Sequence, residues 1–504
     1  MKKISTSVLL CLVAFLGFAT GTKGMNIKIT VKGLESSSMI LANYFGDKQY
    51  VKDTILFDKK GTVVLKADTM LPGGVYLAVF PALGNHYFEF IVSEHEFTLE
   101  TDTFELTGHL KVSPNSVENT LFYDDMKFLG KMKEKSDSIS KLYKAATAKD
   151  YKGDPKDKDK LREQLVGIDG EVKAKRESVI TQHPDLFYAK LLNAMKDIVV
   201  PDAPKDARGK IIDSSFQWRY YKTHYWDNVD LSDERLLRCP VFHPKLKTFW
   251  SQTIVQTPDS LIAGGEELLA KTDKKNEVYR YILTYIFNEA ANSKIMCFDE
   301  VYVHFGESYF CNASLVPWLD TAKRFKICDR VQRLKPVLCD KQAQRLILPT
   351  DSTEGQWKSL YDVKAKYTVL AFWDPDCGHC KKEIPVLVDA YHNLLKKGID
   401  VQVFSPAIME IENYKDWVEF IKKNNLDWIN VCDAKRHSNF RYEWDIQSTP
   451  QIYILDKDKK IKARRIGADQ IEDYILHLEN PAYRGKLNNK VNDDDKQESV
   501  DPGK

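Results

Sequence analysis

Two cysteines separated by two residues, Cys377 and Cys380, are the side chains whose types and spacing most directly indicate chemistry. They follow an apolar stretch and a short turn, and a helical pattern begins beside them. Side chains three positions apart on a helix lie about 5–6 Å from each other, which allows the two sulfurs to form a disulfide. A thiol at a helix start also has its pKa lowered by unpaired backbone N–H groups and by the helix dipole. The pair therefore predicts dithiol–disulfide exchange.

The two cysteines are expected to have different roles because their exposure differs. Cys377, at the exposed helix start, is the predicted nucleophile that attacks a substrate disulfide, and Cys380, one turn further in, is the resolving cysteine. Zinc binding is the main competing interpretation of the motif. Tetrahedral zinc requires two more ligands, and the sequence has no second Cys-x-x-Cys and no spaced His pair. We therefore expect no metal, and no cofactor other than the redox-active pair.

Three charged or titratable side chains lie close to the pair in sequence. His379, as an imidazolium, would stabilise the Cys377 thiolate, whereas the Asp376 carboxylate would oppose its formation. Glu383 is three residues past Cys380 and could exchange a proton with it. For His379 and Glu383 the plainer interpretation is a solvated side chain. Because these charges act in opposite directions, the direction of electron transfer does not follow from them.

The dipeptide Thr449-Pro450 directly precedes the expected strand 451–455. Cis X–Pro bonds occur at tight turns of this kind. In the expected topology this loop faces the cysteine pair and offers backbone groups to which a substrate polypeptide adds as an extended strand. Thr449 and Pro450, together with Trp373 upstream of the motif, are the predicted substrate-binding residues.

The elements that must position these residues alternate between strand and helix over the last third of the chain. The apolar patterns predict strands at 367–372, 401–404, 428–431, 451–455 and 461–465, and helices at 378–396, 414–423, 436–442 and 470–478. A βαβ half followed by a ββα half is the thioredoxin arrangement, an α/β fold.

Residues 370–385, together with Ser448-Thr449-Pro450, resemble the TlpA/ResA-like thiol-disulfide oxidoreductases, which belong to the thioredoxin-fold redoxin (AhpC/TSA) superfamily. The resemblance covers residues 338–480. It implies that Cys377 is the nucleophile, that Cys380 resolves the mixed disulfide, that Pro450 is the cis proline and that Glu383 tunes the pair.

The resemblance also implies disulfide exchange with protein thiols in the periplasm, a membrane or periplasmic electron partner, and a reductase of the cytochrome c maturation type. Two departures limit what carries over. Asp376 stands directly before the first cysteine, where thioredoxins have Trp, and Gly378-His379 is the dipeptide of protein disulfide isomerases. Isomerase potentials lie at about −180 mV and that of thioredoxin at about −270 mV. The sequence therefore leaves two directions open: reduction of substrate disulfides, or their oxidation or isomerisation.

The rest of the chain is expected to form further domains. Short alternating segments separated by glycines predict an antiparallel β-sandwich over residues 25–111, and helical periodicity follows over residues 112–335. With phrases such as Tyr225-Trp226-Asp227-Asn228 and Arg235-Leu236-Leu237-Arg238, this part resembles uncharacterised extracytoplasmic β and helical domains that precede such modules in exported bacterial proteins, which implies no activity. The polar residues 481–504 are expected to be disordered.

The first 24 residues read as a cleaved signal peptide, with two lysines followed by a short apolar run and small residues. Its removal takes away three lysines and no acidic residue, so the formal net charge of +2 becomes −1. A near-neutral chain gives no electrostatic reason to bind nucleic acid. We expect a periplasmic or cell-envelope protein without a transmembrane segment.

Two alternative functions remain at this stage. A thiol peroxidase would carry a threonine three positions before its reactive cysteine, and Asp374 stands there. A binding or scaffold protein with a subordinate thioredoxin domain is the second alternative, because about 310 residues lie outside that domain. Six cysteines outside the motif allow 15 pairings among which the sequence does not choose, and buried free thiols are an equally open alternative: Cys239, Cys297, Cys311, Cys328, Cys339 and Cys432.

Overall fold

The computed structural model describes residues 24–148, 151, 153–154 and 156–483, so the predicted signal peptide, except its last residue, and most of the predicted polar tail lie outside the described residues. The chain divides into two compact units. The first contains the described residues up to Thr253 together with Lys271–Tyr281, and the second contains Ile254–Ala270 and the described residues from Ile282 onward. The division therefore falls inside the stretch expected to be one helical domain.

The first unit begins with a β-sandwich of two four-stranded sheets. Their strand orders are β4-β1-β7-β8 and β3-β2-β5-β6. The strands are β1 (Met25–Lys32), β2 (Ser38–Phe45), β3 (Lys48–Leu56), β4 (Thr62–Ala67), β5 (Gly74–Phe80), β6 (His86–Val92), β7 (Glu96–Asp102) and β8 (Lys111–Val112). All pairings are antiparallel except β1 with β7, which is parallel. The expectation of a wholly antiparallel sandwich fails there because β7 returns to its sheet after the chain has passed through the other sheet, not through a hairpin.

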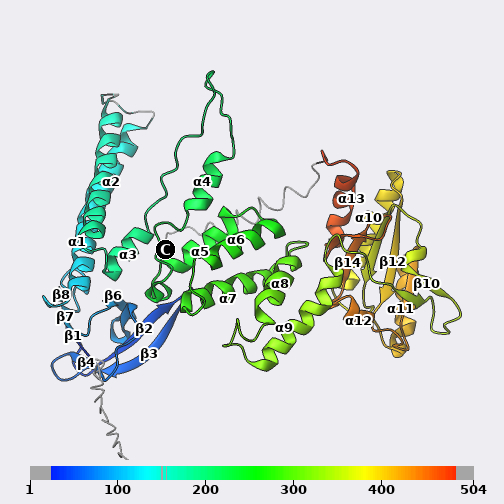
Figure 1. The fold of residues 1–504 in the computed structure, drawn as a ribbon, viewed down its shortest axis with the longest axis horizontal. Coiled ribbons are helices and arrows are strands. Elements are labelled where there is room, and N and C mark those ends of the chain that lie inside the picture. The colour runs from blue at the N-terminus through cyan, green and yellow to red at the C-terminus, as the bar shows by residue number, and fades with distance from the viewer. Residues whose placement is uncertain (1–23, 149–150, 152, 155, 484–504) are drawn as a thin grey trace, which may run out of the picture. The chain divides into compact units, whose positions relative to one another are not determined.

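Helices follow the sandwich in the first unit, and the first of them packs against strand β6. They are α1 (Val117–Ala146), α2 (Asp157–Gln182), α3 (Phe187–Ala194), α4 (Phe216–His224) and α5 (Phe242–Thr248), and α1 and α2 lie side by side as a long pair (Figure 1). The buried Asn119 side chain bonds both the N–H and the carbonyl of Ile91. The Glu118 carboxylate accepts from the N–H groups of Phe187 and Tyr188 at the start of α3. These contacts tie α1 to strand β6 and to α3.

The second unit begins with helices α6 (Pro258–Ala270), α8 (Asp299–Phe305) and α9 (Thr321–Leu334). Helix α7 (Glu277–Asn292) starts in the first unit and ends in the second. A disulfide joins Cys311 to Cys328, and another joins Cys297 to Cys339, which lies just after the helical segment formed by α6, the end of α7, α8 and α9. Cys239 and Cys432 are buried free thiols. The open question of the six cysteines thus resolves into two disulfides and two thiols.

The remainder of the second unit contains a five-stranded sheet with the order β13-β12-β11-β14-β15. The elements are β11 (Tyr367–Phe372), α10 (Cys380–Lys396), β12 (Val401–Ala407), α11 (Tyr414–Lys423), β13 (Ile429–Cys432), α12 (Phe440–Glu443), β14 (Gln451–Leu455), β15 (Ile461–Arg464) and α13 (Ile471–Glu479). Strands β11, β12 and β13 are parallel, and β14 and β15 are antiparallel to their neighbours. The predicted thioredoxin arrangement is confirmed, with a short extra pair, β9 (Ile347–Pro349) and β10 (Trp357–Ser359), ahead of it.

Strand β11 is buried on both faces, as its continuous apolar run predicts. Val369, Ala371 and Trp373 pack in the cluster that includes α10 and α13, whereas Leu370 and Phe372 pack on the opposite face with α12. The strand is thereby fixed between two layers, and the turn that follows it has a rigid starting point.

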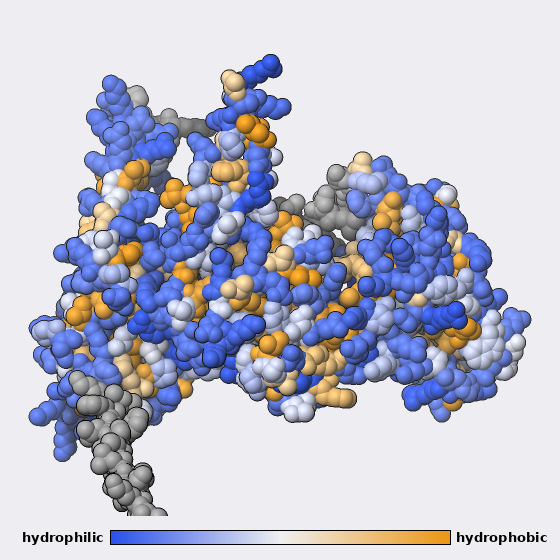
Figure 2. All heavy atoms as spheres, viewed as in Figure 1, coloured by the Kyte–Doolittle hydropathy of each residue, from blue (hydrophilic) through white to orange (hydrophobic). Residues whose placement is uncertain are grey.

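Hydrophilic residues cover most of the face shown in Figure 2, with apolar side chains in scattered patches. Within the residues that the structure describes, no helix combines the length and the apolar character needed to cross a bilayer.

Candidate functional site

The cysteine pair lies at the end of β11, where the chain turns into α10. Helix α10 begins at Cys380, two residues later than the predicted start at 378, and Cys377 lies in the turn before it. The backbone N–H of Cys377 donates to the Asp374 carbonyl at 3.2 Å, which closes this turn. The first cysteine is therefore not a helical residue, and the two sulfurs approach across the helix start instead of along a helix face.

Cys377 nevertheless faces the helix start, as its proposed reactivity requires. The backbone N–H of Cys380, the first residue of α10, donates to the Cys377 sulfur at 3.4 Å. First-turn N–H groups have no partner within their own helix, so they are available to a negatively charged sulfur. Cys377 is partly exposed, whereas Cys380 is fully buried.

The Thr449–Pro450 peptide bond is cis, as predicted, and its loop lies against the pair. The Cys377 thiol donates to the Thr449 carbonyl at 3.3 Å. Strand β14 begins at the next residue, Gln451, and pairs with β11, so one sheet positions both the loop and the cysteines. Thr449 and Pro450 are both partly exposed, which leaves the loop accessible beside the reactive sulfur.

The environment separates the two thiols in acidity. Burial acts to raise the pKa of Cys377, but hydrogen bonds from the Thr449 side chain and from the Cys380 N–H outweigh it, and the pKa is lowered. Burial raises the pKa of Cys380 to about 12, and the neighbouring Cys377 sulfur adds to the rise. The site therefore holds one thiol, Cys377, that ionises readily and one, Cys380, that stays protonated until Cys377 forms a mixed disulfide with a substrate. This fits the predicted roles of nucleophile and resolving cysteine.

The side chains beside the motif take positions that the sequence does not specify. His379 is exposed, and it is its backbone that contributes a hydrogen bond lowering the pKa of Cys377. Asp376 accepts a hydrogen bond from Asn413, a residue that the sequence reasoning missed. Glu383 accepts from the N–H of Ala468 at 3.3 Å, ahead of α13. The proposed proton exchange between Glu383 and Cys380 stays a prediction.

Trp373 does not form part of an accessible substrate surface. Its side chain is fully buried and packs against Phe420 of α11, with ring centroids 5.0 Å apart. The expectation that it binds substrate is corrected accordingly: as the residue after β11, it continues the inward alternation of that strand and fills the core.

Comparison with known proteins finds family matches over two consecutive stretches of the chain. The model of the AhpC/TSA family matches residues 339–464, and that of a domain of unknown function, DUF5106, matches residues 209–336. The thiol-disulfide oxidoreductase ResA of Bacillus cereus is 26% identical over 128 residues, which cover 25% of this chain and 70% of that protein. A thioredoxin-like protein of Haemophilus influenzae is 35% identical over 94 residues, which cover 19% of this chain and 51% of that protein.

A similar solved structure is the crystal structure of a domain of a possible thiol-disulfide isomerase from Cytophaga hutchinsonii. It is 39% identical, covers 29% of this chain and 96% of that domain, and has a TM-score of 0.26. The assignment of residues 339–464 to a family rests on the family model and the sequence relatives. Residues 339–464 are a thioredoxin-like domain of the AhpC/TSA family, and its relatives include the ResA thiol-disulfide oxidoreductases.

Proposed function

We propose that this protein is an exported thiol-disulfide oxidoreductase that exchanges disulfides with polypeptide substrates through Cys377 and Cys380. The observation that carries the proposal is the position of the Cys377 sulfur, between the N–H of Cys380 at 3.4 Å and the carbonyl of Thr449 at 3.3 Å. The first contact favours the thiolate, and the second, made by the protonated thiol, places the sulfur beside a loop where an extended chain can add.

In the reductive direction, the Cys377 thiolate attacks one sulfur of a substrate disulfide. The substrate S–S bond breaks, a Cys377–substrate disulfide forms, and the released substrate thiolate takes a proton from solvent. Cys380 then loses its proton, for which the Glu383 carboxylate or water is the acceptor, and attacks the Cys377 sulfur. The second substrate thiolate leaves, and two electrons have passed from the dithiol to the substrate. A partner dithiol must return two electrons before the next turnover.

Export is supported by the apolar N-terminal pattern and by the disulfides. Cys297–Cys339 and Cys311–Cys328 have geometries that allow closed bonds, with Cα atoms 5.6 Å apart in each pair. Structural disulfides persist in oxidising compartments such as the periplasm. We therefore place the reaction in the periplasm or cell envelope.

The proposed exchange is tested by trapping. Cys380→Ala in the full chain should accumulate mixed disulfides with cellular proteins, which reducing agent releases, because Cys377 can attack but nothing resolves the product. Cys377→Ala and the double variant should trap nothing, and Cys432→Ala combined with Cys380→Ala should trap as well as Cys380→Ala alone. Absence of trapped species together with an unreactive Cys377 would contradict the proposal.

The direction of electron flow is a separate part of the proposal, and here we propose reduction. Equilibration of the Cys377–Cys380 pair with glutathione gives the reduction potential of the pair. A potential of about −270 mV supports a reductase, whereas one of about −180 mV supports oxidation or isomerisation. For the cytochrome c maturation role, the substrate is an oxidised Cys-x-x-Cys-His peptide, the sequence to which c-type haem attaches. If the protein reduces this peptide no faster than a peptide with the same residues in scrambled order, the cytochrome c maturation role is contradicted.

A further inference from the structure

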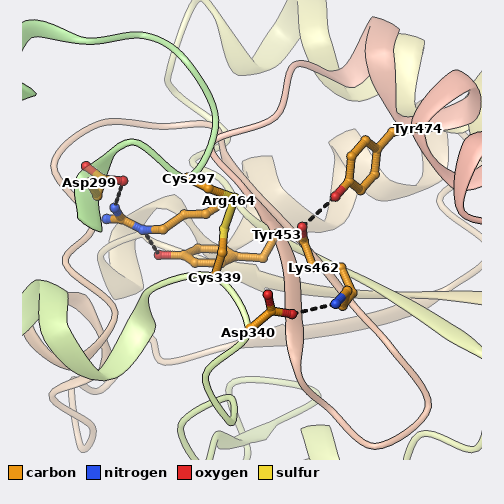
Figure 3. The surroundings of a disulfide bond; sticks show 8 residues. All are labelled: Cys297, Asp299, Cys339, Asp340, Tyr453, Lys462, Arg464 and Tyr474. Carbon is orange, nitrogen blue, oxygen red and sulfur yellow. Dashed lines mark hydrogen bonds and ion pairs between the residues drawn. A yellow bond between two sulfur atoms is a disulfide. The ribbon is translucent and has the colours of Figure 1, made fainter. Parts of the chain in front are cut away.

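A buried polar network lies between the helical segment of the second unit and the sheet that carries the dithiol (Figure 3). Its centre is Arg464 on β15, whose side chain is 1% exposed. Arg464 forms ion pairs with Asp299 of α8 and with Asp445, and Asp445 is also within 3.4 Å of Arg333 on α9. The Tyr442 hydroxyl adds a bond to Asp329 at 2.8 Å. Side chains from both parts of this unit thus meet around one arginine.

Arg464 reaches this face because of an irregularity in the sheet. The register between β14 and β15 shifts between Ile454 and Leu455, so Lys462 has no opposite residue, and Arg464 stands directly across from Tyr453. A bulge of this kind redirects the side chains that follow it. Arg464 Nε donates to the Tyr453 hydroxyl oxygen at 3.2 Å.

The Tyr453 hydroxyl connects the arginine to the start of β14. It accepts from the Gln451 side-chain amide at 2.7 Å and donates to the Trp444 carbonyl at 2.8 Å. With the bond from Arg464, the hydroxyl uses its one hydrogen and both lone pairs. Gln451 is the residue directly after the cis proline. The network therefore ends at the loop that lies 3.3 Å from the Cys377 sulfur.

The Cys297–Cys339 disulfide joins two chain segments, and residues of both segments contact β15 (Figure 3). Asp299 follows Cys297 by two residues and binds Arg464. Asp340 follows Cys339 directly, donates its N–H to the Ile461 carbonyl at 2.7 Å and pairs with Lys462. Both ends of β15 are thus held by residues next to one covalent link.

We propose that Tyr453 and Arg464 are positioning residues of the dithiol site and that, together with Asp299 from the helical segment, they fix the Thr449–Pro450 loop for polypeptide binding. Replacing a buried ion pair by apolar residues is often neutral for stability, so the role we assign to these buried charges is the geometry that they impose. The inference takes the exchange reaction proposed above as its basis. It adds that residues outside the thioredoxin-like domain act on substrate binding.

Two substitutions test this, each with a matched control that removes a contact to the same strand, β15. Tyr453→Phe removes the hydroxyl that joins Arg464 to Gln451, and Tyr474→Phe removes a hydroxyl bonded to the Lys462 carbonyl at 2.6 Å. Asp299→Asn weakens the contact with Arg464, and the control is Asp340→Asn, whose partner is Lys462. Each control alters a contact of β15 that does not lead to the loop.

The first measurement is steady-state kinetics with an oxidised polypeptide and with a small aromatic disulfide. Tyr453→Phe and Asp299→Asn should raise KM for the polypeptide about 3- to 10-fold, the value of one hydrogen bond, and leave kcat and the rate with the small disulfide unchanged. The control variants should match the wild type in KM. Equal KM changes in test and control variants would overturn the proposal.

The second measurement needs no activity. Backbone hydrogen exchange, followed by mass spectrometry, should be faster in the peptide around Thr449–Pro450 for Tyr453→Phe and Asp299→Asn than for their controls. If the wild type reduces no disulfide, the oxidoreductase proposal fails on its own, and exchange still decides whether the network holds the loop. Unchanged exchange in both test variants overturns the positioning role whatever the activity.

Discussion

The hydroxyl of Thr449 offers a direct perturbation of the reactive thiol. Its hydrogen bond is one of the contacts that lower the pKa of Cys377 against the opposing effect of burial. Thr449→Val keeps the side-chain shape and removes the donor, so the thiolate loses a stabilising partner and the pKa of Cys377 rises. Thr449→Ser keeps the donor and serves as the control.

The size of the effect follows from the exposure of the site. A hydrogen bond to a charged group contributes about 1.5–3 kcal/mol, but Cys377 is partly exposed, and water competes for the thiolate. We therefore expect about half of that contribution, which corresponds to a thiolate population about 3- to 10-fold smaller at pH values below the pKa.

The assay is the pH dependence of Cys377 alkylation by iodoacetamide, quantified by mass spectrometry of the reduced protein. Thr449→Val should alkylate about 3- to 10-fold more slowly at pH values below the pKa of Cys377, with its midpoint moved to higher pH, and both variants should reach the wild-type rate at high pH. A midpoint for Thr449→Val equal to that of Thr449→Ser would refute the reasoning.

Three further outcomes are expected. At pH 8 iodoacetamide should modify Cys377 and leave Cys380 unmodified, because Cys380 is buried and its pKa is about 12; comparable labelling of both would contradict this assignment. Replacing Cys297 and Cys339 by serine should lower the free energy of unfolding by about 4 kcal/mol in urea, from the closure entropy of a loop with a sequence separation of 42, and no loss would mean that the bond constrains nothing. Burial, opposed by two backbone N–H donors, raises the pKa of Glu118, so its stabilising contribution is complete below its unfolded pKa and is lost as the pH rises through its folded pKa. Glu118→Gln should flatten that part of the pH–stability curve, and an unchanged slope would exclude Glu118 as its source.

The parts of the site that are local in sequence were predictable from it. The strand 367–372, the cysteine pair and the cis bond before Pro450 each follow from residue types within a few positions, and the structure confirms the strand and the cis bond. The helix start is less well specified, because Gly378 and His379 adopt a turn that moves Cys377 outside the helix. For Trp373 the prediction was wrong. An aromatic residue beside a motif suggests a substrate-binding surface, but the alternation of β11 directs the Trp373 side chain into the core.

The non-local parts were not predictable, and β15 shows why. Along 461–465 the residues alternate as Ile, Lys, Ala, Arg, Arg, which places Arg464 on the polar face with Lys462. The bulge opposite Leu455 reverses that assignment and buries Arg464 against Tyr453. Nothing in the strand itself announces the bulge, and the charges that make the burial tolerable come from Asp299 and Asp445, distant in sequence.

The thioredoxin-like domain depends on residues that precede it in the chain. A fragment beginning at Cys339 would leave that cysteine without its disulfide partner and Arg464 without Asp299. An arginine buried in the full chain would then retain only part of its compensation, and removing one partner of a buried pair is costly. The motif around Cys377 determines the chemistry, but we infer that its geometry toward a polypeptide depends on Cys297 and Asp299, which a domain boundary at 338 would remove, so a fragment that keeps both must begin before Cys297.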